Sequence, residues 1–151
     1  FRRVLLRYVI NRIFHGYGKF EGEMDGRKNG ALISMSTGKA VAFAIFNLQA
    51  RGEMFVTHND PVYEGMIVGL TPKPGDMIIN VMKGKQLTNM RTQGTDENVV
   101  LTPVRQMSIA EQLSMLNTDE ALEITPKSLR LRKAILNPHD RKKSEKSGAA
   151  A

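Results

Sequence analysis

The chain has 151 residues, which suffices for one domain or two small ones, and 41% of them are hydrophobic, enough for a core. Cysteine is absent, which excludes a disulfide framework and a thiolate metal site, and no apolar run approaches the roughly 18 residues of a membrane span. The net charge of +7 is concentrated in residues 1–12 and 127–146, and such basic ends indicate either a polyanionic partner or a solvated, disordered end.

The first half of the chain predicts a strand followed by a helix. Residues 1–18 fit a helix and a strand about equally well, whereas residues 31–35 are typical of a buried strand. The next helix is predicted to begin at a cap on Ser36 or Thr37 and to end at Gly52. Its apolar face comprises Val41, Ala44, Ile45 and Leu48, widened by Phe43 and Phe46.

Two further strands are predicted before a turn that divides the chain. They cover residues 53–57 and 62–70, and Gly65 interrupts the second of them. Together with the helix they predict a small α+β unit in which the helix packs on one face of a sheet. The turn-rich residues 71–75 are interpreted as the boundary to a second domain.

The second half is predicted to be richer in strands. A strand ending near Met82 and another beginning near Val99 flank the polar stretch "MKGKQLTNMRTQGTDEN", which is long for a compact domain unless it has a function. A short helix at residues 108–117 opens with a capping box formed by Ser108 and Glu111. The apolar side of this helix is predicted to comprise Ile109, Leu113 and Leu116.

The chain ends in a predicted strand pair and a basic helix. Residues 121–136 contain two strands joined at "TPK", and the second strand alternates leucine with arginine as Leu129, Arg130, Leu131 and Arg132. Alternation in a strand places the leucines on the core face and the arginines on the solvent face. Asn137 and Pro138 are predicted to cap a strongly basic helix, and residues 144–151 are expected to form a disordered tail.

The sequence indicates no catalytic or metal site. Gly-Lys pairs occur at residues 38–39 and 84–85, but neither has the preceding glycine and the following Ser or Thr that a phosphate-binding P-loop needs. The three histidines are scattered, and the segment from His58 to Asp60 is typical of a turn before Pro61 rather than of a metal site. No enzymatic activity and no cofactor are therefore predicted for this chain.

Two sets of basic residues are candidates for phosphate contacts. In the polar stretch, Lys83, Lys85 and Arg91 accompany Asn89 and glycines that permit close backbone approach, although an ordinary solvated loop remains the alternative. The second set lies in the last strand pair and comprises Lys127, Arg130, Arg132 and Lys133. There the alternative partner is Glu123 on the neighbouring strand. Aromatic residues make up only 6% of the chain, which disfavours a stacking platform for single-stranded bases.

These segments resemble the TypA/BipA translational GTPases, which are relatives of elongation factor G. The resemblance rests on "GRKNGALISMSTGKAVAFAIFNLQARG", "VYEGMIVG" and "GKQLTNMRTQGTDENVVLTP", and on "ITPKSLRLRK" followed by "NPHDRKK". It covers roughly residues 8–143 and implies a C-terminal fragment, in keeping with a chain that begins at Phe1 without a methionine.

The resemblance implies an α+β fold in two parts. Residues 1–72 would form a partial ferredoxin-like unit, similar to the fifth domain of elongation factor G but lacking its first strand. Residues 73–143 would form the small, β-rich C-terminal domain of the family, with short helices. On this basis residues 8–14 are expected to form a strand rather than a helix.

The resemblance also implies binding to the ribosome. The expected partners are 23S rRNA and the acceptor end of the A-site tRNA, in ribosome assembly or stress-adapted translation, with the polar stretch entering that region of the large subunit. GTP and Mg belong to the GTPase domain that this fragment lacks. A monomer without a membrane partner is expected, in a bacterial cytoplasm or a plastid stroma.

A second class of function stays open, namely a basic protein-interaction module that binds an acidic protein partner. RNA binding predicts strong salt dependence through counterion release. Binding to an acidic protein predicts saturable association without protection of RNA from chemical probing.

Overall fold

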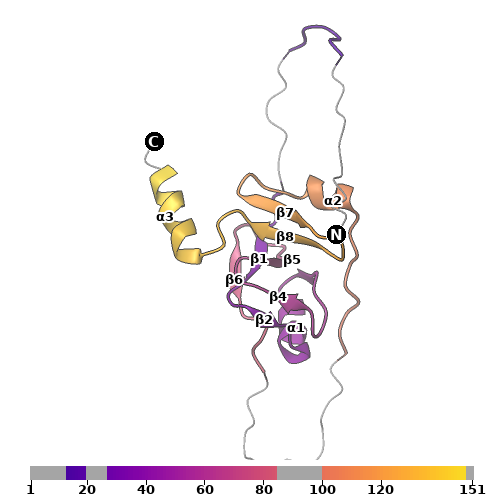
Figure 1. Ribbon diagram of the computed structural model, residues 1–151, viewed down its shortest axis with the longest axis vertical. Helices are drawn as coiled ribbons and strands as arrows, with labels where there is room; N and C mark the ends of the chain where they lie inside the picture. The colour runs from indigo at the N-terminus through magenta and orange to yellow at the C-terminus, as the bar shows by residue number, and fades with distance from the viewer. Residues whose placement is uncertain (1–12, 20–26, 85–99, 149–151) are drawn as a thin grey trace, which may run out of the picture.

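The computed structural model describes residues 13–19, 27–84 and 100–148. They form a mixed arrangement of short helices and strands, which confirms the predicted α+β class. Figure 1 shows helix α1 (Ala42–Gln49) on one side of a central sheet, and a β-hairpin with helix α2 (Ile109–Ser114) on the other side. The ferredoxin-like character of the first part stays a prediction.

The central sheet has four strands in the order β3-β5-β1-β6. In its middle, β1 (Ala31–Ser34) and β5 (Ile67–Leu70) pair antiparallel. On the outer sides, β3 (Glu53–Met54) pairs antiparallel with β5, and β6 (Met77–Ile79) pairs parallel with β1. Every residue of β1 and β5 is buried, so both faces of the sheet centre are covered, as their mainly apolar sequences predict.

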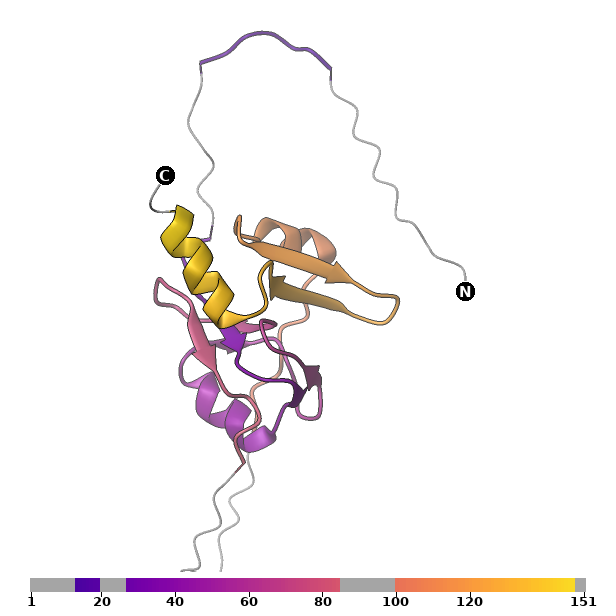
Figure 2. The same cartoon turned by 60° about the vertical axis from the view of Figure 1, so that its left-hand side comes forward.

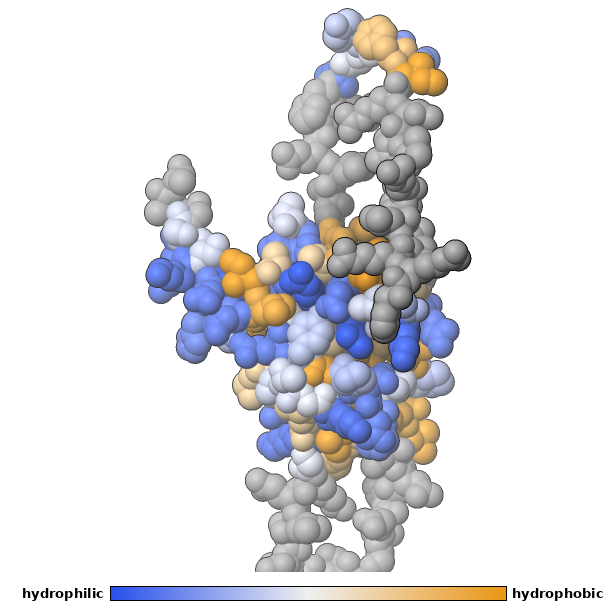
Figure 3. Space-filling model, viewed as in Figure 1, coloured by the Kyte–Doolittle hydropathy of each residue, from blue (hydrophilic) through white to orange (hydrophobic). Residues whose placement is uncertain are grey.

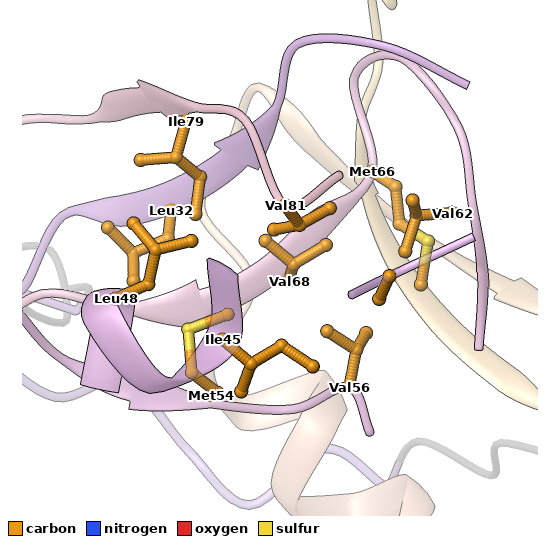
Figure 4. Close-up of a cluster of buried hydrophobic side chains, with 11 residues drawn as sticks. Leu32, Ile45, Leu48, Met54, Val56, Val62, Met66, Val68, Ile79 and Val81 are labelled. Carbon is orange, nitrogen blue, oxygen red and sulfur yellow. The ribbon is translucent and has the colours of Figure 1, made fainter. Parts of the chain in front are cut away.

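The two faces of the sheet carry separate hydrophobic clusters. On one face, Ile45 and Leu48 of α1 pack in a cluster with Leu32 of β1 (Figure 4). On the other face, Ile33 packs in a second cluster with Leu131 of the hairpin. Leu32 and Ile33 point to opposite faces because successive side chains alternate along a strand. Strand β1 thus joins the helix layer to the hairpin layer.

Helix α1 begins at Ala42, well after the predicted cap. The intervening strand β2 (Gly38–Lys39) pairs antiparallel with β4 (Pro61–Val62). The residue that precedes the helix makes no side-chain capping hydrogen bond. The predicted caps at Ser36 and Thr37 are therefore wrong, because a contact between distant segments holds the chain extended where local sequence favours a helix start.

The buried face of α1 agrees with most of the prediction. Ala44, Ile45 and Leu48 are buried, as expected from their helical spacing. Phe46 is 49% exposed and does not belong to that face. It follows Ile45 directly, and consecutive helical residues point about 100° apart because a turn has about 3.6 residues.

Gly65 interrupts the strand predicted across residues 62–70, as expected. Its φ of 82° is a backbone conformation that residues with a Cβ rarely adopt. A Cβ at this position would lie 2.7 Å from Cα of Leu136, so the glycine also permits a close approach. The backbone N–H of Lys133 donates to the Gly65 carbonyl at 2.9 Å. The beginning of β5 is thereby joined to the end of the hairpin.

The predicted hairpin is present, whereas the predicted boundary does not divide the sheet. Strands β7 (Glu120–Ile124) and β8 (Leu129–Lys133) pair antiparallel in register. The boundary had been placed at residues 71–75, between β5 and β6. Both of these strands flank β1 in the same sheet, so the sheet continues across this turn.

Helix α2 begins with the predicted capping box. Oγ of Ser108 accepts the backbone N–H of Glu111 at 3.3 Å, and Oε2 of Glu111 accepts the backbone N–H of Ser108 at 2.9 Å. The predicted apolar side is partly wrong. Leu113 is 48% exposed, whereas Gln112 is only 7% exposed and faces the interior.

Helix α3 (Pro138–Gly148) is the predicted basic helix. Oδ1 of Asn137 accepts the backbone N–H of His139 at 2.8 Å, which confirms the predicted cap. The helix continues through Gly148, so the structure differs here from the disordered tail predicted for residues 144–151. In Figures 1 and 2 it stands as an arm beside the sheet and the hairpin.

Residues 13–19, the first part of the chain that the structure describes, carry neither helix nor strand. Ile13 is 91% exposed and Tyr17 is fully exposed, and the rings of Phe14 and Tyr17 meet edge to face at 5.4 Å. Most of the strand predicted for residues 8–14 lies outside the described residues.

Candidate nucleic-acid interface

The polar stretch after β6 contributes one residue to the described surface. Lys83 is exposed just beyond the end of β6. The other three predicted contact residues of this stretch, Lys85, Asn89 and Arg91, lie outside the described residues and stay predictions. The available geometry of this candidate set is therefore a single lysine at the beginning of the stretch.

The arginines of β8 have partners within the fold. Arg130 lies opposite Glu123 in the hairpin register, with Nη1 3.7 Å from Oε1 of Glu123. The same carboxylate accepts a hydrogen bond from the hydroxyl of Tyr63 at 2.6 Å. Nη1 of Arg132 donates to the carbonyl of Lys133 at 3.2 Å. The ion pair with Glu123 is thus present, and RNA contacts by Arg130 and Arg132 stay predictions.

Tyr63 reports the electrostatics of this arginine face. Burial and the hydrogen bond to Glu123 raise the pKa of Tyr63 from 10.0 to about 12, because both disfavour a tyrosinate there. The positive charges of Arg132 and Arg130 act in the opposite direction and are weaker. Both arginines act on the same hydroxyl, as expected if they share one face of the strand.

Lys133 occupies a position unlike the predicted one. It is only 1% exposed, and its Nζ lies 2.7 Å from Oδ2 of Asp119 and 3.0 Å from Oε1 of Glu120, with Asp76 as a third partner. These three carboxylates use all the donors of the ammonium group. The predicted RNA contact does not fit this burial. Strand alternation itself places Lys133 on the face of Leu131, a signal that the sequence offered.

The ion network around Lys133 extends to Arg27. Nη2 and Nη1 of Arg27 approach the two carboxylate oxygens of Glu120 at 2.7 Å and 3.2 Å. Burial would raise the pKa of Asp76, but hydrogen bonds from Lys133 and from the backbone of Ala31 lower it below its ordinary value. Burial would lower the pKa of Lys133, but its carboxylate partners raise it. The network is therefore ionised at neutral pH and structural in character.

Exposed lysines occur at the hairpin turn and on α3. Lys127 lies exposed between β7 and β8, at a position that the sequence predicted. Helix α3 adds the exposed residues Lys142, Lys143 and Lys146. Figure 3 shows hydrophilic residues over most of this helix. The sequence predicted the basic helix without assigning its lysines to the site, and the signal was the uninterrupted basic run that begins at Arg141.

Arg141 fixes the base of α3. Its Nη1 donates to the carbonyls of Ile135 and Leu136 at 3.1 Å and 2.9 Å. The same Leu136 approaches Gly65, so the linker into α3 contacts the beginning of β5. The lysines of α3 therefore stand on a helix whose first turn is tied to the fold.

The structure does not bring the two predicted sets together. The segment that follows β6 leaves the fold beside α1, whereas β7 and β8 lie at the opposite end of the long axis in both views (Figures 1 and 2). Helix α3 stands on the hairpin's side of the sheet. A polyanion that contacts both Lys83 and Lys127 must therefore span the length of the fold.

Other chemistry finds no support in the described residues. The segment around His58 is a turn, as predicted, since Asp60 accepts hydrogen bonds from the N–H and the hydroxyl of Thr57 at 2.6 Å and 2.9 Å. Within residues 13–19, 27–84 and 100–148 there is no cluster of His, Asp or Glu suited to a metal ion. Over the same ranges, no helix has the length and apolarity to cross a membrane.

Comparison with known proteins gives consistent relatives. BipA from Buchnera aphidicola subsp. Schizaphis graminum, named "Large ribosomal subunit assembly factor BipA", is 51% identical over 134 residues, which are 88% of this chain and 22% of that protein. The protein of the same name from Salmonella typhimurium is 47% identical over 125 residues, 83% of this chain and 21% of the relative. The chain spans about a fifth of the length of these curated relatives.

A family model places these matches on the fold. The model described as "TypA/BipA C-terminal domain" matches residues 29–138, from just before β1 to the first residue of α3. It therefore includes the central sheet, the ion network from Asp76 onward and the hairpin with its arginines. This chain belongs to the TypA/BipA C-terminal domain family.

Proposed function

We propose that this chain is the ribosome-binding, C-terminal portion of a translational GTPase that takes part in assembly of the large ribosomal subunit. The observation that carries this proposal is the match to large ribosomal subunit assembly factors over 88% and 83% of the chain. Hydrolysis of GTP, with its Mg ion, would belong to the part of the relatives that this chain does not span. The chain itself would bind and not catalyse, in the cytoplasm.

The charge distribution supports RNA as the ligand on the ribosome. Exposed lysines at the hairpin turn, on α3 and after β6 are suited to phosphate oxygens, because flexible ammonium groups neutralise backbone charge without reading bases. The proposed ligands are 23S rRNA and the acceptor end of an A-site tRNA. The proposed contact residues of the hairpin are Lys127, Arg130 and Arg132, and those of the polar stretch are Lys83, Lys85, Asn89 and Arg91.

The first test measures binding of the 151-residue chain to purified large ribosomal subunits between about 50 and 200 mM salt, where each phosphate contact contributes roughly 0.7–0.9 to the slope of log K against log salt. Alanine at Lys142, Lys143 and Lys146 together should weaken binding and reduce that slope by about 2–3. Alanine at Lys83, Lys85 and Arg91 together should act in the same direction.

The matched control places alanine at Lys39 and Lys73. Both lysines are exposed, and neither belongs to the proposed surface. Their removal should leave the slope nearly unchanged, although it lowers the net charge as well. Binding that does not depend on salt, or two triple variants that bind as tightly as the parent, would contradict the RNA assignment.

A further inference from the structure

The largest cavity that the described residues enclose lies between α2, the hairpin and the beginning of β5. It has a volume of about 1650 Å³. Its walls come from residues 55–57, 104–107 and 124–131, with Met66, Ile67, Ile109 and Gln112 among the lining side chains. We call it the α2–hairpin groove. Cavities for small ligands measure about 300–1,000 Å³, so this volume suits a segment of a polymer better than a small molecule.

The walls of the groove favour aliphatic side chains over nucleobases. Most lining residues are apolar, but Phe55 is the only aromatic among them. Stacking of single-stranded bases needs aromatic side chains, so the groove is poorly suited to RNA. Met66 and Met107 add flexible thioethers, which adapt to aliphatic partners of different shape. Ile124 is 47% exposed at the groove, where a partner would cover it.

A buried amide in the groove lacks part of its hydrogen bonding. Gln112 is 7% exposed, and its Nε2 donates to the carbonyl of Met107 at 3.4 Å. Its Oε1 has no hydrogen-bond partner in the described part of the chain. A buried acceptor without a donor costs free energy, so a ligand that brings an N–H group gains from this position. The backbone of an extended peptide offers such groups at regular intervals.

The charges at the groove favour an acidic partner. Lys127 is exposed at the rim and forms no ion pair with another described residue. Arg105 and Arg130 also line the groove, each beside a carboxylate of the fold. The acidic lining residue, Asp60, is already occupied by two hydrogen bonds from Thr57. The charge left without a counterion is thus positive.

We propose that the α2–hairpin groove binds an extended segment of a partner protein that carries aliphatic side chains and at least one carboxylate. The aliphatic side chains cover Ile124 and the two methionines, a backbone N–H of the segment donates to Oε1 of Gln112, and the carboxylate lies beside Lys127. This interaction is separate from binding to RNA phosphates, although the hairpin turn takes part in both.

The test selects peptides from a random 12-residue display library on the 151-residue chain. Enriched peptides should combine Leu, Ile, Val or Met with Asp or Glu, and their affinities are then measured by fluorescence anisotropy. Ile124→Arg should weaken binding about tenfold or more, because it places a charge against the apolar segment. Lys127→Glu should weaken acidic peptides by a similar factor, and this loss should shrink at high salt.

Leu113→Arg is the matched control. Leu113 is 48% exposed on the same helix as Gln112 but does not line the groove, so this variant should bind the peptides like the parent. Gln112→Leu should weaken the peptides while the variant remains folded by circular dichroism, because an apolar side chain of similar size replaces the amide.

Three outcomes would overturn the proposal. The first is the absence of enrichment, or enriched peptides that bind Ile124→Arg as well as the parent. The second is a 12-nucleotide single-stranded RNA that competes with the peptides for the groove, which would assign the groove to nucleic acid. The third is loss of peptide binding at high protein concentration, which would assign it to a second copy of the chain. The binding of large subunits by the α3 lysines is measured separately, so failure of one proposal leaves the other intact.

Discussion

At the scale of single residues, the buried ammonium of Lys133 carries a clear consequence for stability. Lys133→Met would leave Asp76, Asp119 and Glu120 without their common cation. We expect the free energy of unfolding to fall by roughly 3 kcal/mol, the lower end of the range for broken buried pairs, because Asp76 and Asp119 keep contact with solvent. Urea denaturation monitored by circular dichroism measures the change.

Lys127→Met provides the control from the same hairpin. Lys127 is exposed, so its replacement should change the free energy of unfolding by no more than about 0.5 kcal/mol. If the two variants are equally stable, the ion network does not stabilise the fold, and Lys133 is again a candidate for a ligand contact.

At the scale of elements, Gly65 couples the sheet to the linker of α3. Gly65→Ala would add a Cβ at 2.7 Å from Cα of Leu136, in a backbone conformation with φ of 82°. We expect a loss of roughly 3 kcal/mol, from about 1–2 for the backbone and 1–3 for the steric overlap. The amide resonances of α3 should shift as its linker is displaced.

Gly75→Ala separates these two causes. Gly75 has φ of 93°, yet a Cβ there would meet no atom within 4 Å. It should cost only the backbone share, about 1–2 kcal/mol, and should leave the resonances of α3 in place. Equal losses in both variants would mean that the approach of Leu136 to Gly65 contributes nothing.

The elements also show which features the sequence could predict. The capping box of Ser108 and the alternation around Leu131 were predictable, because both depend on residues close in sequence. The beginning of α1 was not, because β2 forms only when β4, from a distant segment, pairs with it. Among the candidate contacts, the exposure of Lys127 was predictable from its turn. The burial of Lys133 depends on carboxylates that three separate segments bring together.

At the scale of the whole molecule, the ion network sets the pH range of maximal stability. The pKa of Asp76 is below 3.8 in the folded chain, so its contribution is present above pH 3.8 and is lost as the pH falls through the lower folded value. The pKa of Lys133 is above 10.5, so its contribution is complete below pH 10.5 and is lost as the pH rises through the folded value.

The difference in unfolding free energy between the parent and Lys133→Met should therefore be constant at neutral pH. It should shrink below pH 3.8 and above pH 10.5. Urea titrations across the pH range measure this difference. A difference that stays the same at both extremes would show that lost packing, rather than lost charge, explains the variant.

The parallel pairing of β1 with β6 also determines how the molecule comes apart. Because β1 lies between strands from both sides of the turn at residues 71–75, neither side holds a complete sheet by itself. A chain cut at this turn would leave β1 with an unpaired edge, the feature through which strands aggregate. The sheet, the helix beneath it and the hairpin above it should therefore open in a single cooperative event, and the amides of β1 and β5 should exchange with solvent only through global unfolding.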